Sequence, residues 1–226
     1  MKQEEKMKVN NINKIILLMS LACPFILQQA MAAHDHEAME SGDHHHHHSS
    51  AAPSQKPINP TIPDPVLVDQ DGKQHHFYSD LLKGKLVLMN SIYTSCQGTC
   101  PIQTAIFSQT RKMLGDRIGQ DVQMISVSLD PVTDTPERLK EFASKHGVTD
   151  NNGWLFLTGT KQNVTEVLQA MDLYSADPED HTPIAAVGNE PAGIWMKVVN
   201  LNSPIELVRR IDYVKTLGEE RVSKNQ

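Results

Sequence analysis

The apolar run LVLMNSI at residues 86–92 leads directly into YTSCQGTCP, and this junction constrains the fold more than any other part of the chain. A short apolar run of this kind predicts a buried strand. Proline has no backbone N–H and is tolerated in the first turn of a helix, so Pro101 predicts a helix over residues 101–114. The junction therefore predicts a strand, a short loop and a helix, with Cys96 and Cys100 in the loop.

The spacing of the two cysteines leaves more than one chemistry open. A helix N-terminus presents free N–H groups and a partial positive charge, which stabilise a thiolate near Cys100. A structural disulfide closing so short a loop would restrict the unfolded chain little, so we favour a functional pair. The C-x3-C spacing is one residue longer than the C-x2-C of thioredoxin-like redox sites. Two soft thiolates joined by one imidazole suit copper, and a simple thiol redox pair remains open.

The rest of the chain alternates between strand and helix patterns. A β-hairpin is predicted to turn at Asp71-Gly72, followed by buried strands at LVLMNSI and VQMISVSL and a late strand at IWMKVVN. Helical periodicity marks DTPERLKEFASKHG and the segment around residues 164–171, and Ser203-Pro204-Ile205-Glu206 combines a capping box with proline at the first helical position. We predict an α/β fold: a thioredoxin-like central sheet with helices on both faces and an N-terminal β-hairpin.

Residues 1–32 have the pattern of a secretory signal. Four lysines precede the apolar stretch IILLMSLACPFIL, and Ala30-Met31-Ala32 matches a small-residue cleavage site. The stretch is shorter than the roughly 20 residues of a membrane span. We therefore expect an exported, periplasmic or otherwise extracytoplasmic protein. An uncleaved signal acting as a membrane tether is the alternative.

Removing the signal leaves Cys96 and Cys100 as the two remaining cysteines and moves the formal charge from −6 to −8, because four Lys and two Glu are lost. Such a negative chain does not fit a phosphate backbone, so nucleic acid is not an expected partner. Residues 33–63 form a polar, His-rich leader that we predict to be disordered. Its histidines indicate either a native metal-capturing arm or an affinity tag. One domain is predicted at 64–217, and a polar C-terminal tail at 218–226.

Four segments together resemble the Sco/SenC family, thioredoxin-like copper proteins that assist assembly of the CuA centre of cytochrome c oxidase. They are YTSCQGTCP, SVSLDPVTDTPERLKEF, WLFLTG and EDHTP, and the similarity covers nearly all of residues 64–217. The loop residues Gln97-Gly98-Thr99 depart from the Pro-Asp-Val of many members. The resemblance implies a copper site built from Cys96, Cys100 and His181. It also implies a partner that accepts copper, such as a cytochrome c oxidase subunit.

The remaining histidines and carboxylates have ordinary structural interpretations. His75 and His76 alternate along a strand and are predicted to lie on the hairpin surface, facing opposite ways. His146 is predicted to end a helix, where a cation suits the dipole. Asp134 or Thr135 is predicted to cap the helix that contains Pro136.

Two functions follow from the cysteine pair. The first is a copper chaperone in which the disulfide is the empty, oxidised form. The second is a thiol–disulfide oxidoreductase that reduces cysteines of a metalloprotein partner and is itself reduced by a thioredoxin-like protein. His181 separates them, because a pure reductase does not need it. A peroxidase ranks last, since the expected proline and arginine near Cys96 are not evident.

Overall fold

An eight-stranded mixed sheet organises the structure, a computed structural model that describes residues 56–150, 153–177, 183–199 and 201–224. The strands follow the spatial order β1-β8-β7-β4-β5-β6-β2-β3. Their bounds are β1 Lys56–Ile58, β2 Val66–Asp69, β3 Gln74–His76, β4 Leu86–Ile92, β5 Val122–Ser128, β6 Trp154–Thr158, β7 Ile184–Asn189 and β8 Ile194–Val199.

The centre of the sheet is parallel and fully buried. Strand β4 pairs with β5 from Leu86↔Val122 to Ile92↔Ser128, and β5 pairs in parallel with β6. Every residue of β4 and β5 is buried, which explains why both read as continuous apolar runs rather than alternating ones. The strands predicted at LVLMNSI and VQMISVSL are confirmed.

Antiparallel strands extend the sheet on both sides. The β2–β3 hairpin turns at the predicted place, with Gly72 at φ +80°, and β2 pairs with β6. On the other side β7 pairs with β4, and β8 pairs with β7. The β7 strand brings residue 184 to the edge of the sheet where β4 ends.

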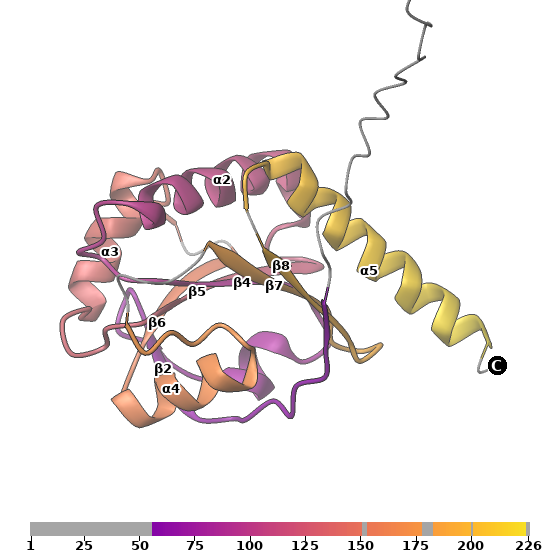
Figure 1. Cartoon of the computed structure of the whole chain (residues 1–226), viewed down its shortest axis with the longest axis horizontal. Helices are drawn as coiled ribbons and strands as arrows, with labels where there is room; N and C mark the ends of the chain where they lie inside the picture. Colours follow the sequence, from indigo (N-terminus) through magenta and orange to yellow (C-terminus); the bar gives the residue numbers. More distant parts are fainter. Residues whose placement is uncertain (1–55, 151–152, 178–182, 200, 225–226) are drawn as a thin grey trace, which may run out of the picture. The chain divides into compact units, whose positions relative to one another are not determined.

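Helices cover both faces of the sheet (Figure 1). One face packs against α2, α3 and α5, and the opposite face packs against α4 and the π-helical turn η1. The bounds are η1 Phe77–Leu82, α2 Thr99–Leu114, the 3-10 turn η2 Gly115–Arg117, α3 Pro136–Lys145, α4 Lys161–Ala170 and α5 Pro204–Lys224. The predicted fold class is confirmed. Among the described residues, none of the helices combines the length and hydrophobicity of a membrane span.

Three boundaries differ from the sequence prediction. Residues 56–58, within the segment predicted to be disordered, form β1 because β8 offers its free edge to them. Residues 218–224, predicted as a tail, continue α5: Gly218 is buried, and Arg221 donates a hydrogen bond to the carbonyl of Ala192 at 2.6 Å. Helix α2 begins two residues before Pro101, which still lies in its first turn.

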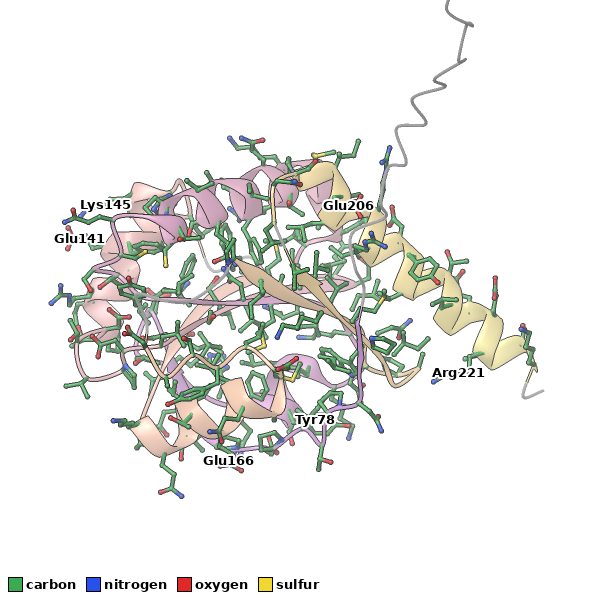
Figure 2. All side chains as sticks on the ribbon, in the orientation of Figure 1. Tyr78, Glu141, Lys145, Glu166, Glu206 and Arg221 are labelled. Carbon is green, nitrogen blue, oxygen red and sulfur yellow. The ribbon has the colours of Figure 1, made fainter. Side chains whose placement is uncertain are left out.

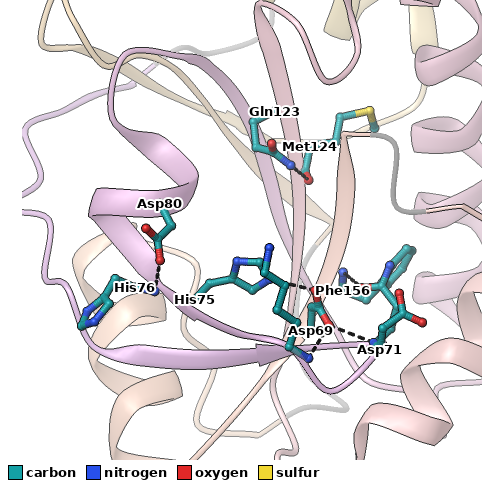
Figure 3. A network of polar contacts seen from close by, with 10 residues as sticks. Asp69, Asp71, His75, His76, Asp80, Gln123, Met124 and Phe156 are labelled. Atoms are coloured by element: carbon teal, nitrogen blue, oxygen red, sulfur yellow. Dashed lines mark hydrogen bonds and ion pairs between the residues drawn. The ribbon is translucent and has the colours of Figure 1, made fainter.

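The prediction that His75 is a surface residue is wrong. His75 is buried, and its Nε2 lies 2.8 Å from Oδ2 of Asp69, which is buried as well (Figure 3). The other oxygen of Asp69 accepts hydrogen bonds from the backbone N–H groups of Asp71 and Lys73. His76 faces the opposite way and is exposed, as predicted. The pair ties the two strands of the hairpin together at its turn.

Candidate metal centre

The two cysteines lie where β4 passes into α2. The N–H of Cys96 donates to the carbonyl of Tyr93 at 3.3 Å, which folds the loop into a turn. The N–H of Cys100, in the first turn of α2, donates to Sγ of Cys96 at 3.3 Å. An N–H group of the helix N-terminus therefore reaches the sulfur of Cys96, whereas the sequence predicted this stabilisation near Cys100.

The two thiols differ in exposure and acidity. Cys96 is half-buried and Cys100 is fully buried, and neither is in a disulfide. Burial raises the pKa of the Cys100 thiol well above its usual value, and the sulfur of Cys96 adds to this effect. Burial acts against ionisation of Cys96, but hydrogen bonds from the backbone and side chain of Cys100, together with those from Tyr93 and Gly98, hold the pKa of Cys96 below its usual value. Cys96 is thus the more reactive sulfur.

The carboxylate of Asp134 holds the start of the cysteine loop through hydrogen bonds. This role was not predicted from the sequence. Its fully buried carboxylate accepts hydrogen bonds from the N–H of Thr94 at 3.2 Å and from the hydroxyl of Ser128 at 2.6 Å. The hydroxyl of Thr94 donates to the same carboxylate. Because Thr94 is two residues from Cys96, Asp134 fixes the start of the loop.

The two residues predicted as alternative helix caps, Asp134 and Thr135, have different roles in the structure. Thr135 caps α3, with its hydroxyl accepting from the N–H of Arg138 at 3.4 Å, so the alternative that Asp134 is the cap is wrong. Asp130 only closes its own turn, where its carboxylate accepts from the N–H of Thr133. A signal for Asp134 was available: β4 and β5 are adjacent parallel strands, so the residues after them meet at one edge of the sheet.

His181 lies outside the described residues, so the third proposed ligand has no described geometry. Its nearest described neighbour on the C-terminal side, Pro183, leads into β7. There the side-chain amide of Gln103 on α2 donates to the carbonyl of Ile184 at 2.8 Å. Within the described ranges, no three His, Cys, Asp or Glu side chains form a metal-binding group.

His146 ends α3 as predicted, but it does not behave as the predicted cation. Its ring packs against Phe142 with ring centroids 4.6 Å apart. Burial lowers the pKa of His146, and neighbouring Lys145 lowers it further. The neutral form is therefore favoured at the end of this helix.

The fold and the cysteine loop define a class of protein: an α/β, thioredoxin-like sheet with a dithiol at the junction of the first central strand and its helix. The SCO1/SenC family model matches residues 55–194, and the chain belongs to this family.

Relatives and solved structures agree with this membership. The SCO1 protein homolog of Bacillus subtilis is 38% identical over 111 residues, which is 49% of this chain and 55% of that protein. A relative from Stutzerimonas stutzeri named "Putative copper-binding protein" is 25% identical over 168 residues, 73% of this chain and 72% of that protein. The chain thus spans about half the length of the first of these relatives.

Two solved structures cover most of the domain. The structure of BsSco, described as a member of the Sco family of cytochrome c oxidase assembly proteins with a disulfide switch, is 29% identical with a TM-score of 0.59, covering 72% of this chain and 97% of that one. A SCO1/SenC family lipoprotein from Bacillus anthracis str. Ames is 26% identical with a TM-score of 0.57, covering 71% and 98%.

Proposed function

We propose that this protein is an exported copper-binding protein that delivers copper to, or assembles, the CuA centre of cytochrome c oxidase. Copper is held by Cys96, Cys100 and His181. The observation that carries the proposal is the dithiol at the start of α2, where the N–H of Cys100 lies 3.3 Å from the sulfur of Cys96. One sulfur is accessible enough to meet an incoming ion, and the other is buried behind it.

The donor set fits copper. Thiolates are soft ligands that select Cu(I), and an imidazole is accepted by both Cu(I) and Cu(II). Each thiol must lose its proton when the metal binds, so binding releases protons. A neutral His181 would contribute a ring nitrogen without adding charge. Copper is the cargo of this site, taken up and then passed to an acceptor.

The names of the relatives support the same conclusion. The relative from Stutzerimonas stutzeri carries copper binding in its name, and BsSco is described as belonging to a family of cytochrome c oxidase assembly proteins. We infer that a cytochrome c oxidase subunit, or another copper protein, is the acceptor here.

We infer that the protein works outside the cytoplasm. The pattern at residues 1–32 is that of an export signal, and the neighbour from Bacillus anthracis is described as a lipoprotein. The mature chain would begin near Ala33, or the uncleaved signal would tether it to the membrane.

A second function, thiol–disulfide oxidoreduction, is favoured by the contrast between the two sulfurs. A half-buried thiol of lowered pKa beside a fully buried thiol of raised pKa suits an attacking and a resolving cysteine. BsSco is described as having a disulfide switch. The two functions are compatible, because both require the reduced dithiol.

An anaerobic Cu(I) titration of the reduced protein tests the proposal. The leader histidines must first be replaced by serine at full chain length, because they could bind copper by themselves: His34, His36, His44, His45, His46, His47 and His48. One copper per chain should bind tightly, and Cys96→Ser or Cys100→Ser should each abolish this binding. Equal affinity in the parent and both serine variants would refute the proposed site.

A further inference from the structure

A charged groove lies against Cys96 on the side of α3. The cavity measures about 230 Å³, with Cys96 in one wall and Arg138, Glu141, Lys145 and His146 from α3 in the other. Figure 2 shows Glu141 and Lys145 projecting together from the outer side of α3. Residues 138, 141 and 145 fall on one face of the helix because they are three and four positions apart.

The rim of the groove carries two cations and one carboxylate on a protein of negative net charge, and the buried carboxylate of Asp134 accepts hydrogen bonds from Thr94 in the groove wall. Arg138 and Lys145 bring two cations and Glu141 one carboxylate, which pairs with Lys145 at 2.7 Å. His146 adds no charge in its neutral form. The first turn of α2, in which the N–H of Cys100 reaches the sulfur of Cys96, carries no acidic residue. The chain as a whole has a formal charge of −6, so the two cations at this rim are opposite in sign to the net charge of the protein.

We propose that this groove docks a polypeptide partner with an acidic side chain close to the cysteine that exchanges with Cys96. The inference deepens the second proposed function, thiol–disulfide oxidoreduction, on which it rests. Arg138 and Lys145 are about 10 Å apart along the helix, from the rise of about 1.5 Å per residue. Alternate residues of an extended segment are spaced about 6.7 Å apart, so an acid two positions from the partner's cysteine can reach this face.

The size of the groove favours a polypeptide segment over a packed protein element. A space of about 230 Å³ accepts one or two side chains beside the sulfur. Phe142 is buried at its floor, and the charged groups of Arg138, Glu141 and Lys145 are exposed at its rim. This arrangement orients a partner by charge and leaves the sulfur of Cys96 accessible to the partner's disulfide.

The exchange step balances within the two molecules. The Cys96 thiolate attacks one sulfur of the partner's disulfide, a mixed disulfide forms, and the partner's second cysteine leaves as a thiolate that takes a proton from water. Cys100 loses its proton and attacks the sulfur of Cys96. A Cys96–Cys100 disulfide forms and the partner leaves with both cysteines reduced, so two electrons pass from this protein to the partner.

The test compares three short disulfide-bridged peptides that differ at one position, two residues from a cysteine: glutamate, glutamine or lysine. The full-length reduced protein is mixed with each peptide in the presence of a chelator, and the second-order rate constant of exchange is measured. We expect the glutamate peptide to react about two- to fivefold faster than the glutamine peptide, in line with one or two exposed charge contacts. Raising the salt concentration should reduce this ratio.

Three variants of α3 give matched readouts. Arg138→Gln should bring the ratio close to one, and Glu141→Gln should increase it because Lys145 loses its internal partner. Lys140→Gln removes the same charge from the same helix, but Lys140 pairs with Asp71 outside the groove and should leave the ratio unchanged. A variant that changed only the pKa of Cys96 would alter the rates with all three peptides by the same factor, and the ratio between the glutamate and glutamine peptides would not change.

Several results would overturn the inference. Equal rates for the three peptides, or a Lys140→Gln effect as large as that of Arg138→Gln, would remove the groove from partner selection while leaving the proposed function standing. Glutathione disulfide reacting faster than the glutamate peptide, with the same dependence on Arg138, would assign the groove to a small anionic disulfide. No exchange with any peptide would contradict the oxidoreductase function and this inference together.

Discussion

Replacing Asp134 with alanine should destabilise the protein by about 3–5 kcal/mol. The carboxylate is fully buried and accepts hydrogen bonds from the N–H and hydroxyl of Thr94 and from the hydroxyl of Ser128. Each donor left unsatisfied costs about 1–3 kcal/mol, and water can relieve Thr94 because it is only half-buried. Asp134→Asn keeps the shape and one acceptor, and its amide can donate to a rotated Ser128 hydroxyl, so it should cost about 1–2 kcal/mol.

Urea unfolding of the reduced, metal-free protein measures this difference. Asp130→Ala is the matched control, because Asp130 is on the same loop but accepts a single backbone hydrogen bond at 3.3 Å and is half-buried. It should cost no more than about 1 kcal/mol. An Asp134→Ala variant as stable as Asp130→Ala would refute the argument that Asp134 anchors the loop.

Three further predictions concern packing, thiol chemistry and pH. Gly188→Ala should lower the free energy of unfolding by about 3 kcal/mol or prevent folding, because the new Cβ would lie 2.2 Å from the ring of Trp195. Gly98→Ala is the control, because its Cβ would meet no atom within 4 Å and it should be tolerated. Urea unfolding measures both. In alkylation with iodoacetamide, the Cys100→Ser variant should label at Cys96 readily at neutral pH, while the Cys96→Ser variant should label slowly at Cys100 until the pH is raised; equal rates would contradict the assigned roles. Because the folded pKa of His146 is lowered, the unfolded chain binds its proton first, so stability should fall as the pH drops below about 6.5, and His146→Gln should flatten that part of the curve.

The sequence was sufficient for the elements whose signals are local. The buried runs of β4 and β5, the Asp71-Gly72 turn and the start of the helix that contains Pro136 depend on residues within a few positions of each other, and all were predicted. The junction carrying Cys96 and Cys100 was predicted on the same basis. These features depend on short-range backbone chemistry, which the sequence displays directly.

Two strands of the sheet depend on partners elsewhere in the chain. Strand β7 contains a glycine, which weakens a strand pattern, and Gly188 is required because the ring of Trp195 on β8 occupies the space of a side chain. Strand β1 exists because β8 has a free edge. Both strands also pair with segments that are far away in the sequence, β7 with β4 and β1 with β8.

The same reason separates the predicted site from the structure. Nothing local distinguishes Asp134 from Thr135 as a helix cap, and the donors of Asp134 come from the ends of two different strands. The alternation of side chains along a strand correctly predicted that His75 and His76 face opposite ways. It did not predict that His75 is buried, because that depends on its contact with Asp69 across the hairpin.

The most direct test of the central claim is the Cu(II) spectrum of the protein without leader histidines, compared with that of its His181→Ala variant. If Cys96, Cys100 and His181 share one copper ion, the parent should develop a sulfur-to-copper charge-transfer band that saturates at one copper per chain. His181→Ala should bind copper more weakly and shift this band while leaving thiol–disulfide exchange intact. A variant with the same band and the same affinity as the parent would contradict the three-ligand site and favour the oxidoreductase.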